Sequence, residues 1–174
     1  MKKNYLYLFV VLVLTACGQG AENQSNKQDT TAQTQEIDPR SISGIDKIPV
    51  MDSINLQAND DMRFDKELFK IKRNRKIVLR LKNIGSLKGM PMSHNVVILQ
   101  KGTDITTFAD EARNAKKEGY IPSKFSSSII VHTKQVSAGK TDEIKFTIAM
   151  PGVYNYLCSF PGHWGSMQGQ IVVE

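Results

Sequence analysis

The segment YNYLCSFPGHWGSM near the C-terminus holds a cysteine, a histidine and a methionine close together. Cys158, His163 and Met167 are separated by four and then by three residues. Because Cys158 ends a predicted strand and Pro161–Gly162 bends the chain, a loop of this length could bring all three side chains around one point. His94, at the start of another predicted strand, would add a second imidazole.

Two histidines, one cysteine and a weak axial methionine are the donors of a blue-copper site, whereas structural zinc sites use four cysteines and histidines. Sulfur favours Cu(I) and imidazole suits both oxidation states, so such a site changes little when one electron moves. It also leaves no easy open position for a substrate. The spacing therefore predicts one copper ion per chain and an electron carrier, not an enzyme.

Each of these side chains has a simpler interpretation when it is taken alone. A single buried cysteine, a core methionine or a hydrogen-bonded histidine is common, and only the joint spacing indicates a metal site. The axial position also has an alternative, because Gln168 could replace Met167 and glutamine takes this role in some copper sites. The loop spacing favours Met167.

Short runs of alternating apolar and polar residues surround the proposed ligands. Ile77, Leu79 and Leu81, for example, fall on one face of a predicted strand with basic residues on its other face. The pattern predicts half-buried antiparallel strands at Lys76–Lys82 and Glu143–Ile148, and further strands at Ile54–Ala58, Phe64–Ile71, His94–Gln100, Ile129–His132, Val153–Cys158 and Gln168–Val173. So many short strands indicate an all-β sandwich of two sheets.

One stretch, Thr103–Glu118, has helical spacing instead. Ile105, Phe108 and Ala112 recur on one face, behind a possible cap at Thr103 or Asp104. This stretch predicts a helical flap inserted between strands, with the apolar stripe as its packing face.

The N-terminus reads as an export signal. Lys2 and Lys3 precede a short apolar run that is too short to span a membrane, and Leu14-Thr15-Ala16 precedes Cys17. This pattern is similar to the bacterial lipobox, in which the cysteine becomes the acylated first residue; an uncleaved anchor or an ordinary signal is the alternative. The expected organisation is a lipoprotein signal peptide at residues 1–16, a lipid-anchored flexible linker at residues 17–50 and a globular domain at residues 51–174.

Composition narrows the possible functions. The 174 residues, 40% of them apolar, suffice for one domain with a core. The net charge of +6 falls to about +4 if Lys2 and Lys3 are removed, which is too mild for a nucleic-acid groove. A copper enzyme such as a nitrite reductase needs a second metal site, and His132 is the one histidine left for it. The two cysteines, Cys17 and Cys158, lie in such different contexts that no internal disulfide is expected.

From about Ser53 onward the chain resembles the azurins, which are type 1 blue-copper cupredoxins. The resemblance rests on Asn59-Asp60-Asp61-Met62-Arg63-Phe64, Ser93-His94-Asn95-Val96-Val97, Val131-His132-Thr133-Lys134 and Cys158-Ser159-Phe160-Pro161-Gly162-His163 with Met167. It implies a cupredoxin Greek-key β-sandwich and a role as an electron shuttle.

The resemblance also implies roles for residues beside the copper ligands. The carbonyl of Ser93 would be a weak fifth contact, Asn95 would tie the two ligand loops together, and the amide of Phe160 would donate a hydrogen bond to the sulfur. Electrons would leave through the exposed edge of His163. An apolar docking patch would surround that edge, formed by Met62, Leu87, Met92, Phe160, Pro161 and Trp164, with Met90 as a further candidate.

The chain departs from the azurin pattern at two places. Asp52 and Asn74 stand near positions where azurins commonly have a disulfide. Asn83 replaces a buried, titrating histidine that many azurins carry, so a weak pH dependence of the reduction potential is expected.

The expected function is one-electron transfer between respiratory redox partners, such as a cytochrome c and a terminal oxidase or reductase. The carrier would face the periplasm or the cell surface as a monomer or transient dimer. A periplasmic copper carrier or copper-stress protein of the same fold is the alternative, and a closed thiolate-containing ligand set favours electron transfer.

Overall fold

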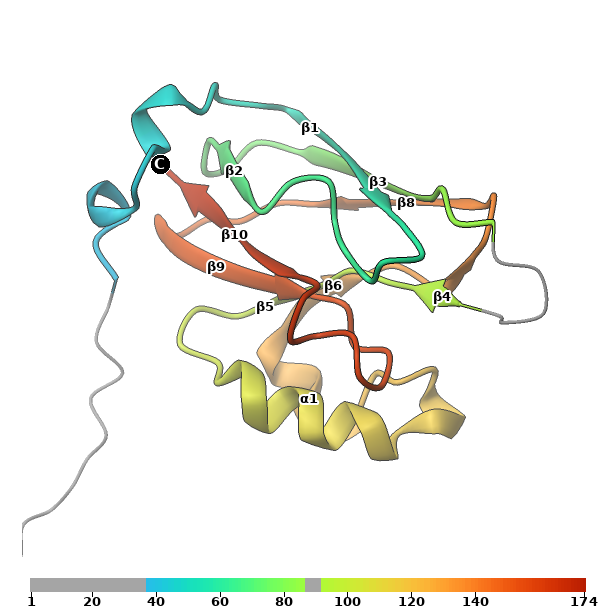
Figure 1. Cartoon of the computed structure of the whole chain (residues 1–174). Helices are drawn as coiled ribbons and strands as arrows, with labels where there is room; N and C mark the ends of the chain where they lie inside the picture. Colours follow the sequence, from blue (N-terminus) through green and yellow to red (C-terminus); the bar gives the residue numbers. More distant parts are fainter. Residues whose placement is uncertain (1–36, 87–91) are drawn as a thin grey trace, which may run out of the picture. The chain divides into compact units, whose positions relative to one another are not determined.

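The computed structural model of the chain describes residues 37–86 and 92–174 (Figure 1). Within these residues the strands are β1 (Ser53–Ala58), β2 (Leu68–Ile71), β3 (Ile77–Asn83), β4 (Ser93–His94), β5 (Val97–Leu99), β6 (Ile129–His132), β7 (Val136–Ser137), β8 (Thr141–Phe146), β9 (Gly152–Leu157) and β10 (Gln168–Val173). No helix in this part of the chain is long and apolar enough to cross a membrane.

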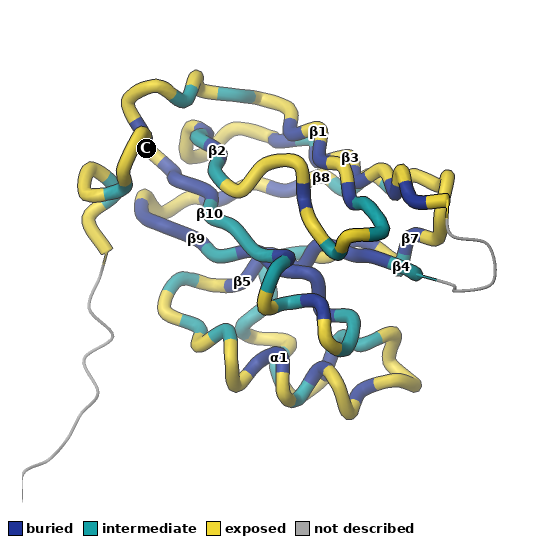
Figure 2. The backbone as a smooth tube through the Cα atoms, in the orientation of Figure 1, coloured by how far each residue is buried: buried dark blue, intermediate teal, exposed yellow. Residues whose placement is uncertain are grey.

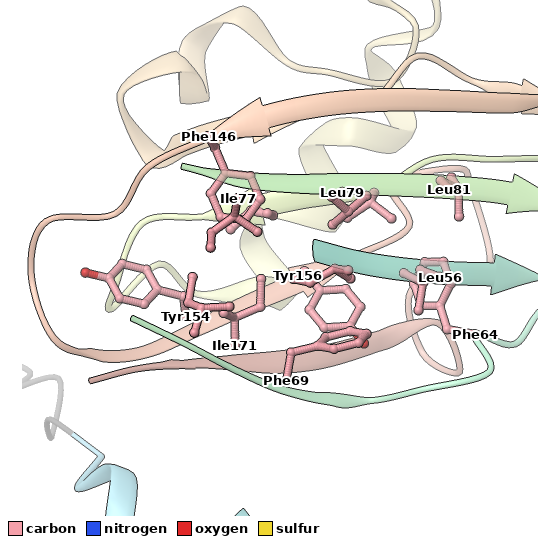
Figure 3. Close-up of a cluster of buried hydrophobic side chains, with 14 of the residues drawn as sticks. Leu56, Phe64, Phe69, Ile77, Leu79, Leu81, Phe146, Tyr154, Tyr156 and Ile171 are labelled. Carbon is pink, nitrogen blue, oxygen red and sulfur yellow. The ribbon is translucent and has the colours of Figure 1, made fainter. Parts of the chain in front are cut away.

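The strands form two main sheets and one small one. The first has the order β1-β3-β8, the second has the order β2-β10-β9-β5-β6, and β4 pairs with β7. Alternation places Leu56, Leu79 and Leu81 on inner faces, where each is at most 1% exposed. Figure 3 shows Leu56 and Phe64 close to Phe69 and Tyr156, so side chains from both sheets form one core.

Strand pairing is antiparallel for β3 and β8, as expected, and parallel for two other pairs of strands. β1 pairs with β3 in parallel, and β10 pairs with β2 in parallel. Parallel pairing requires a crossover between the sheets, which alternation within a single strand does not reveal. The antiparallel prediction is therefore confirmed for β3 with β8, whereas the two parallel pairs were not predicted.

Several strand boundaries also differ from the expected ones. The predicted strand Phe64–Ile71 is regular only from Leu68, and Phe64 makes an isolated bridge to Ala58. The predicted strand His94–Gln100 is split into β4 and β5, because the amide of Val96 donates a hydrogen bond to the hydroxyl of Thr133. β8 begins and ends two residues earlier than predicted, and the two-residue strand β7 was not predicted.

The helical flap consists of α1 (Ile105–Asn114) and two 3-10 helices, Lys116–Glu118 and Ser123–Ser128. Asp104 caps α1 by accepting a hydrogen bond of 2.7 Å from the amide of Thr107. The predicted helix continued to Glu118, but α1 ends at Asn114. Its buried side packs on β5 and β9 (Figure 2), through Phe108, Ala109, Ala112, Val97, Leu99 and Leu157.

An N-terminal strap packs against the sandwich before residue 51. It contains the 3-10 helices Pro39–Ser41 and Ile45–Lys47, and Val50 forms a parallel bridge with Lys70. Ile45 is 6% exposed and packs with Val153 and Val172. The packed part of the chain therefore overlaps the linker expected at residues 17–50, whereas the signal segment and Cys17 lie outside the described residues.

Candidate metal centre

Three of the four predicted ligands meet at one point. The side-chain donor atoms of His94, Cys158 and His163 all lie within 4.8 Å of one another, and all three residues are buried. The sulfur of Cys158 is 3.6 Å from Nδ1 of His163, and the two imidazole centroids are 5.0 Å apart. The fold thus brings His94 and Cys158, which are 64 positions apart in the sequence, close enough to bind one metal ion.

Backbone hydrogen bonds shape the loop that carries Cys158 and His163. The amide of His163 donates to the carbonyl of Phe160 at 3.1 Å, and the amide of Met167 donates to the carbonyl of His163 at 2.9 Å. Gly162 has φ +84°, a conformation that glycine adopts without strain. The amide of Cys158 then donates to the carbonyl of Met167 at 2.9 Å. Met167 is fully buried in the same core cluster as Cys158.

His94 is positioned by β4 and by a buried asparagine. His94 pairs with Val136 across the two-residue ladder of β4 and β7. Nδ2 of Asn83 donates to the carbonyls of Met92 and Val136, at 3.1 and 2.9 Å, and its Oδ1 accepts from the amide of Gly85 at 2.9 Å. Asn83 therefore holds both sides of the His94 ladder without carrying a charge.

Asn95 connects the His94 segment to the Cys158 loop. Its Nδ2 donates to Oγ of Ser159 at 2.8 Å, and its Oδ1 accepts from the amide of Ser159 at 2.9 Å. Asn95 and Ser159 are both buried. Two hydrogen bonds therefore join the two segments that supply the donors.

Burial sets the protonation of the metal-free site. It raises the pKa of the Cys158 thiol to about 11, while hydrogen bonds from the amides of Asn95 and Phe160 act in the opposite direction. Burial and the neighbouring His94 lower the pKa of His163 to about 4. Burial also lowers the pKa of His94, against the opposing effects of Asp60 and the Asn59 backbone. At neutral pH the site thus holds two neutral imidazoles and one thiol.

The residues fit a copper ion. Neither ring nitrogen of His94 makes a hydrogen bond of regular geometry within the described part of the chain, although the residue is fully buried. Buried polar atoms almost always have partners, so an unpaired imidazole beside a thiol and a second imidazole indicates a ligand. Soft sulfur with two imidazoles suits copper.

The other predicted site residues are placed as follows. Phe160 covers His163, with ring centroids 4.7 Å apart, and Met62, Met92 and Pro161 are partly exposed. Ser93 lies directly before His94, and Leu87 and Met90 lie outside the described residues. Trp164 packs against the flap cluster. His132 is exposed and is not part of the donor cluster.

One residue at the site was missed in the sequence. Tyr120, in the flap, packs edge-on against Phe160 with ring centroids 5.1 Å apart. It follows Gly119 in a turn, and turn composition alone gives no signal for a contact 40 positions away in the chain.

The sequence matches the profile of the copper binding proteins of the plastocyanin/azurin family over residues 51–174. This chain belongs to that family. Curated azurins are similar to it: the azurin of Alcaligenes faecalis is 30% identical over 122 residues, which cover 68% of this chain and 94% of that protein. The azurin of Achromobacter denitrificans is 32% identical over 120 residues, which cover 67% and 80%.

Solved structures agree with this assignment. The dithionite-reduced auracyanin of Roseiflexus castenholzii superimposes with a TM-score of 0.65 at 28% identity, covering 72% of this chain and all but 1% of the other. An azurin of Methylomonas sp. strain J shares the fold, with a TM-score of 0.63 at 20% identity. The expected fold, a cupredoxin β-sandwich with a helical flap, is thereby confirmed, and so is copper as the family's metal.

Proposed function

We propose that this protein is a blue-copper one-electron carrier, with copper held by His94, Cys158 and His163 and more weakly by Met167. The observation that carries the proposal is the convergence of three buried donors within 4.8 Å in a protein of the plastocyanin/azurin family. The carbonyl of Ser93 is the proposed weak contact opposite Met167. Copper supplies the one-electron couple, and the chain supplies the geometry.

The way the donors are held supports electron transfer. Asn95 joins the His94 segment to the Cys158 loop, and Asn83 fixes the β4 ladder. Because all three donors are buried and cross-connected, they keep their positions when the charge of the metal changes by one. A small rearrangement on electron transfer makes exchange fast.

The test is the visible spectrum of the full chain loaded with Cu(II). We expect the intense blue absorption of a copper–thiolate bond, and we expect it to disappear in Cys158→Ser. Cys17→Ser is the matched control, since it removes the other cysteine of the chain and should keep the colour. A protein that stays colourless with Cu(II) would contradict the proposal.

A copper-delivery role is tested on the same protein by competition with a chelator. A closed site with a buried thiolate should release copper slowly, on a much longer time than one redox cycle. Rapid release that leaves the fold intact would favour a copper carrier over an electron carrier.

We also propose that the protein is an exported lipoprotein, acylated at Cys17, that faces the periplasm or the cell surface. Its partners would be respiratory redox proteins such as a cytochrome c and a terminal oxidase or reductase. The support is the lipobox-like sequence before Cys17 and the family of the domain. Labelling cells with a fatty-acid analogue tests the anchor: wild-type protein should carry the label, and Cys17→Ser should not.

A further inference from the structure

A row of aromatic rings connects the flap to the donor cluster. Tyr120 packs edge-on against Phe160, with ring centroids 5.1 Å apart and an interplanar angle of 65°. Phe160 packs against His163 at 4.7 Å, and His163 lies 5.0 Å from His94. Within the described chain, these contacts join the partly exposed Tyr120 to both proposed imidazole ligands.

The backbone of Tyr120 is unusual. Tyr120 has φ +65°, directly after Gly119 with φ +64°. A bulky residue rarely adopts this conformation, and glycine adopts it freely. Hydrogen bonds hold the turn: the amide of Tyr120 donates to the carbonyl of Ala115 at 2.9 Å, and Nε2 of Gln135 donates to the carbonyl of Gly119 at 3.3 Å. Glycine would adopt this backbone conformation with less strain than tyrosine does. The tyrosine side chain is therefore the feature of this turn that needs an explanation.

The exposure of the residues around His163 indicates a role for the Tyr120 ring. His163 is only 3% exposed, so a partner protein has little direct contact with its imidazole. Phe160 and Tyr120 are both partly exposed, Phe160 packs directly against that imidazole, and Tyr120 packs against Phe160 from the flap. A partner that docks over His163 would therefore meet these two rings.

We propose that Tyr120 is a positioning residue for electron exchange: it holds Phe160 against His163 and extends the apolar docking surface onto the flap. The partner it fits is a redox protein that presents an apolar patch over its own redox centre. This inference rests on the proposed function, because it concerns electron exit from the copper site. Tyr120 itself touches neither the metal nor the proposed ligands and acts through Phe160.

The test is electron self-exchange between the Cu(I) and Cu(II) forms of the copper-loaded full chain, measured by NMR line broadening. Each copy serves as the partner of the other, so no physiological partner is needed. Tyr120→Gly removes the ring and relieves the strained backbone, which offsets part of the cost of the substitution to folding. The loss of one aromatic contact on each copy should lower the self-exchange rate constant about tenfold.

Two further variants separate the ring from general packing. Tyr120→Phe keeps the edge-on contact and should keep the wild-type rate. Phe125→Ala removes a comparable edge-on pair inside the flap, with Phe108 at 5.6 Å, and should lower the melting temperature without changing the rate.

The outcomes for this inference and for the proposed function are distinguishable. Blue wild-type protein with an unchanged rate in Tyr120→Gly would overturn the role of Tyr120 and leave the electron carrier standing. Equal rate losses in Tyr120→Gly and Phe125→Ala would also overturn it, since the flap would then act only as a structural support. A colourless wild-type protein would overturn the proposed function.

Discussion

Asn95→Ala tests whether the two donor segments depend on their direct connection. The substitution removes both hydrogen bonds between the Asn95 side chain and Ser159, at 2.8 and 2.9 Å, and leaves the amide and hydroxyl of Ser159 without these partners. Ser159 is 3% exposed, so water cannot readily replace the lost amide group. The damage should therefore exceed the loss of two ordinary hydrogen bonds.

The magnitude follows from burial. A buried polar group left without a partner costs about 1 to 3 kcal/mol, and two groups are affected, so the free energy of unfolding should fall by about 3 kcal/mol. For a domain of this size that corresponds to a fall in melting temperature of roughly 10 °C. Because the His94 segment and the Cys158 loop lose their connection, copper should also exchange faster with a chelator.

Urea denaturation of the metal-free protein measures the stability change, and chelator competition measures copper release. Asn55→Ala is the matched control: Asn55 is exposed on β1, and its substitution should change the free energy of unfolding by less than about 0.5 kcal/mol. If Asn95→Ala behaves like this control in both assays, the connection between the segments does not organise the site, and our account of the preformed metal centre is wrong.

Three other predictions concern charge and packing. Asn83 cannot titrate, so voltammetry between pH 5 and 8 should show a nearly constant reduction potential for the wild-type protein. In Asn83→His the potential should rise as the pH falls, because a protonated imidazole disfavours Cu(II). A histidine-like shift in the wild-type protein would refute this prediction. Because burial raises the pKa of the Cys158 thiol to about 11, copper binding at pH 7 should release one proton per copper ion. A copper titration in a weak buffer with a pH indicator measures this release, and the absence of any released proton would contradict the prediction. In Gly169→Ala the new methyl group would collide with the backbone carbonyl of Glu67, which should lower the free energy of unfolding by about 2 kcal/mol. Gly165 has open space around it, so Gly165→Ala should leave the free energy of unfolding nearly unchanged in the same urea assay.

The loop that carries Cys158 and His163 could be predicted because its information is local. Four residues with a bend separate the two donors, and the predicted strand Val153–Cys158 matches β9 (Gly152–Leu157) to within one residue at each end. The cap of α1 at Asp104 is local in the same way, since an N-cap side chain bonds the amide three residues later.

Other features depend on contacts between distant segments. The parallel pairing of β1 with β3, the two-residue strand β7 and the contact of Tyr120 with Phe160 leave no periodic signal, because each depends on where another segment lies. Asn83 was recognised as a substitution for a histidine. Its three hydrogen bonds around the His94 ladder became visible only in the folded chain.

The sequence by itself determined which donors exist and which metal they prefer, because donor type and loop spacing are properties of the residues. The tertiary structure decided how these donors are held: it brings His94 to the Cys158 loop, buries all three donor side chains and lowers or raises their pKa values. It also decided what covers them, since the flap ring at Tyr120 reaches His163 through Phe160. The physical reason is that ligand chemistry belongs to single side chains, whereas burial and position arise from many contacts between segments distant in the chain.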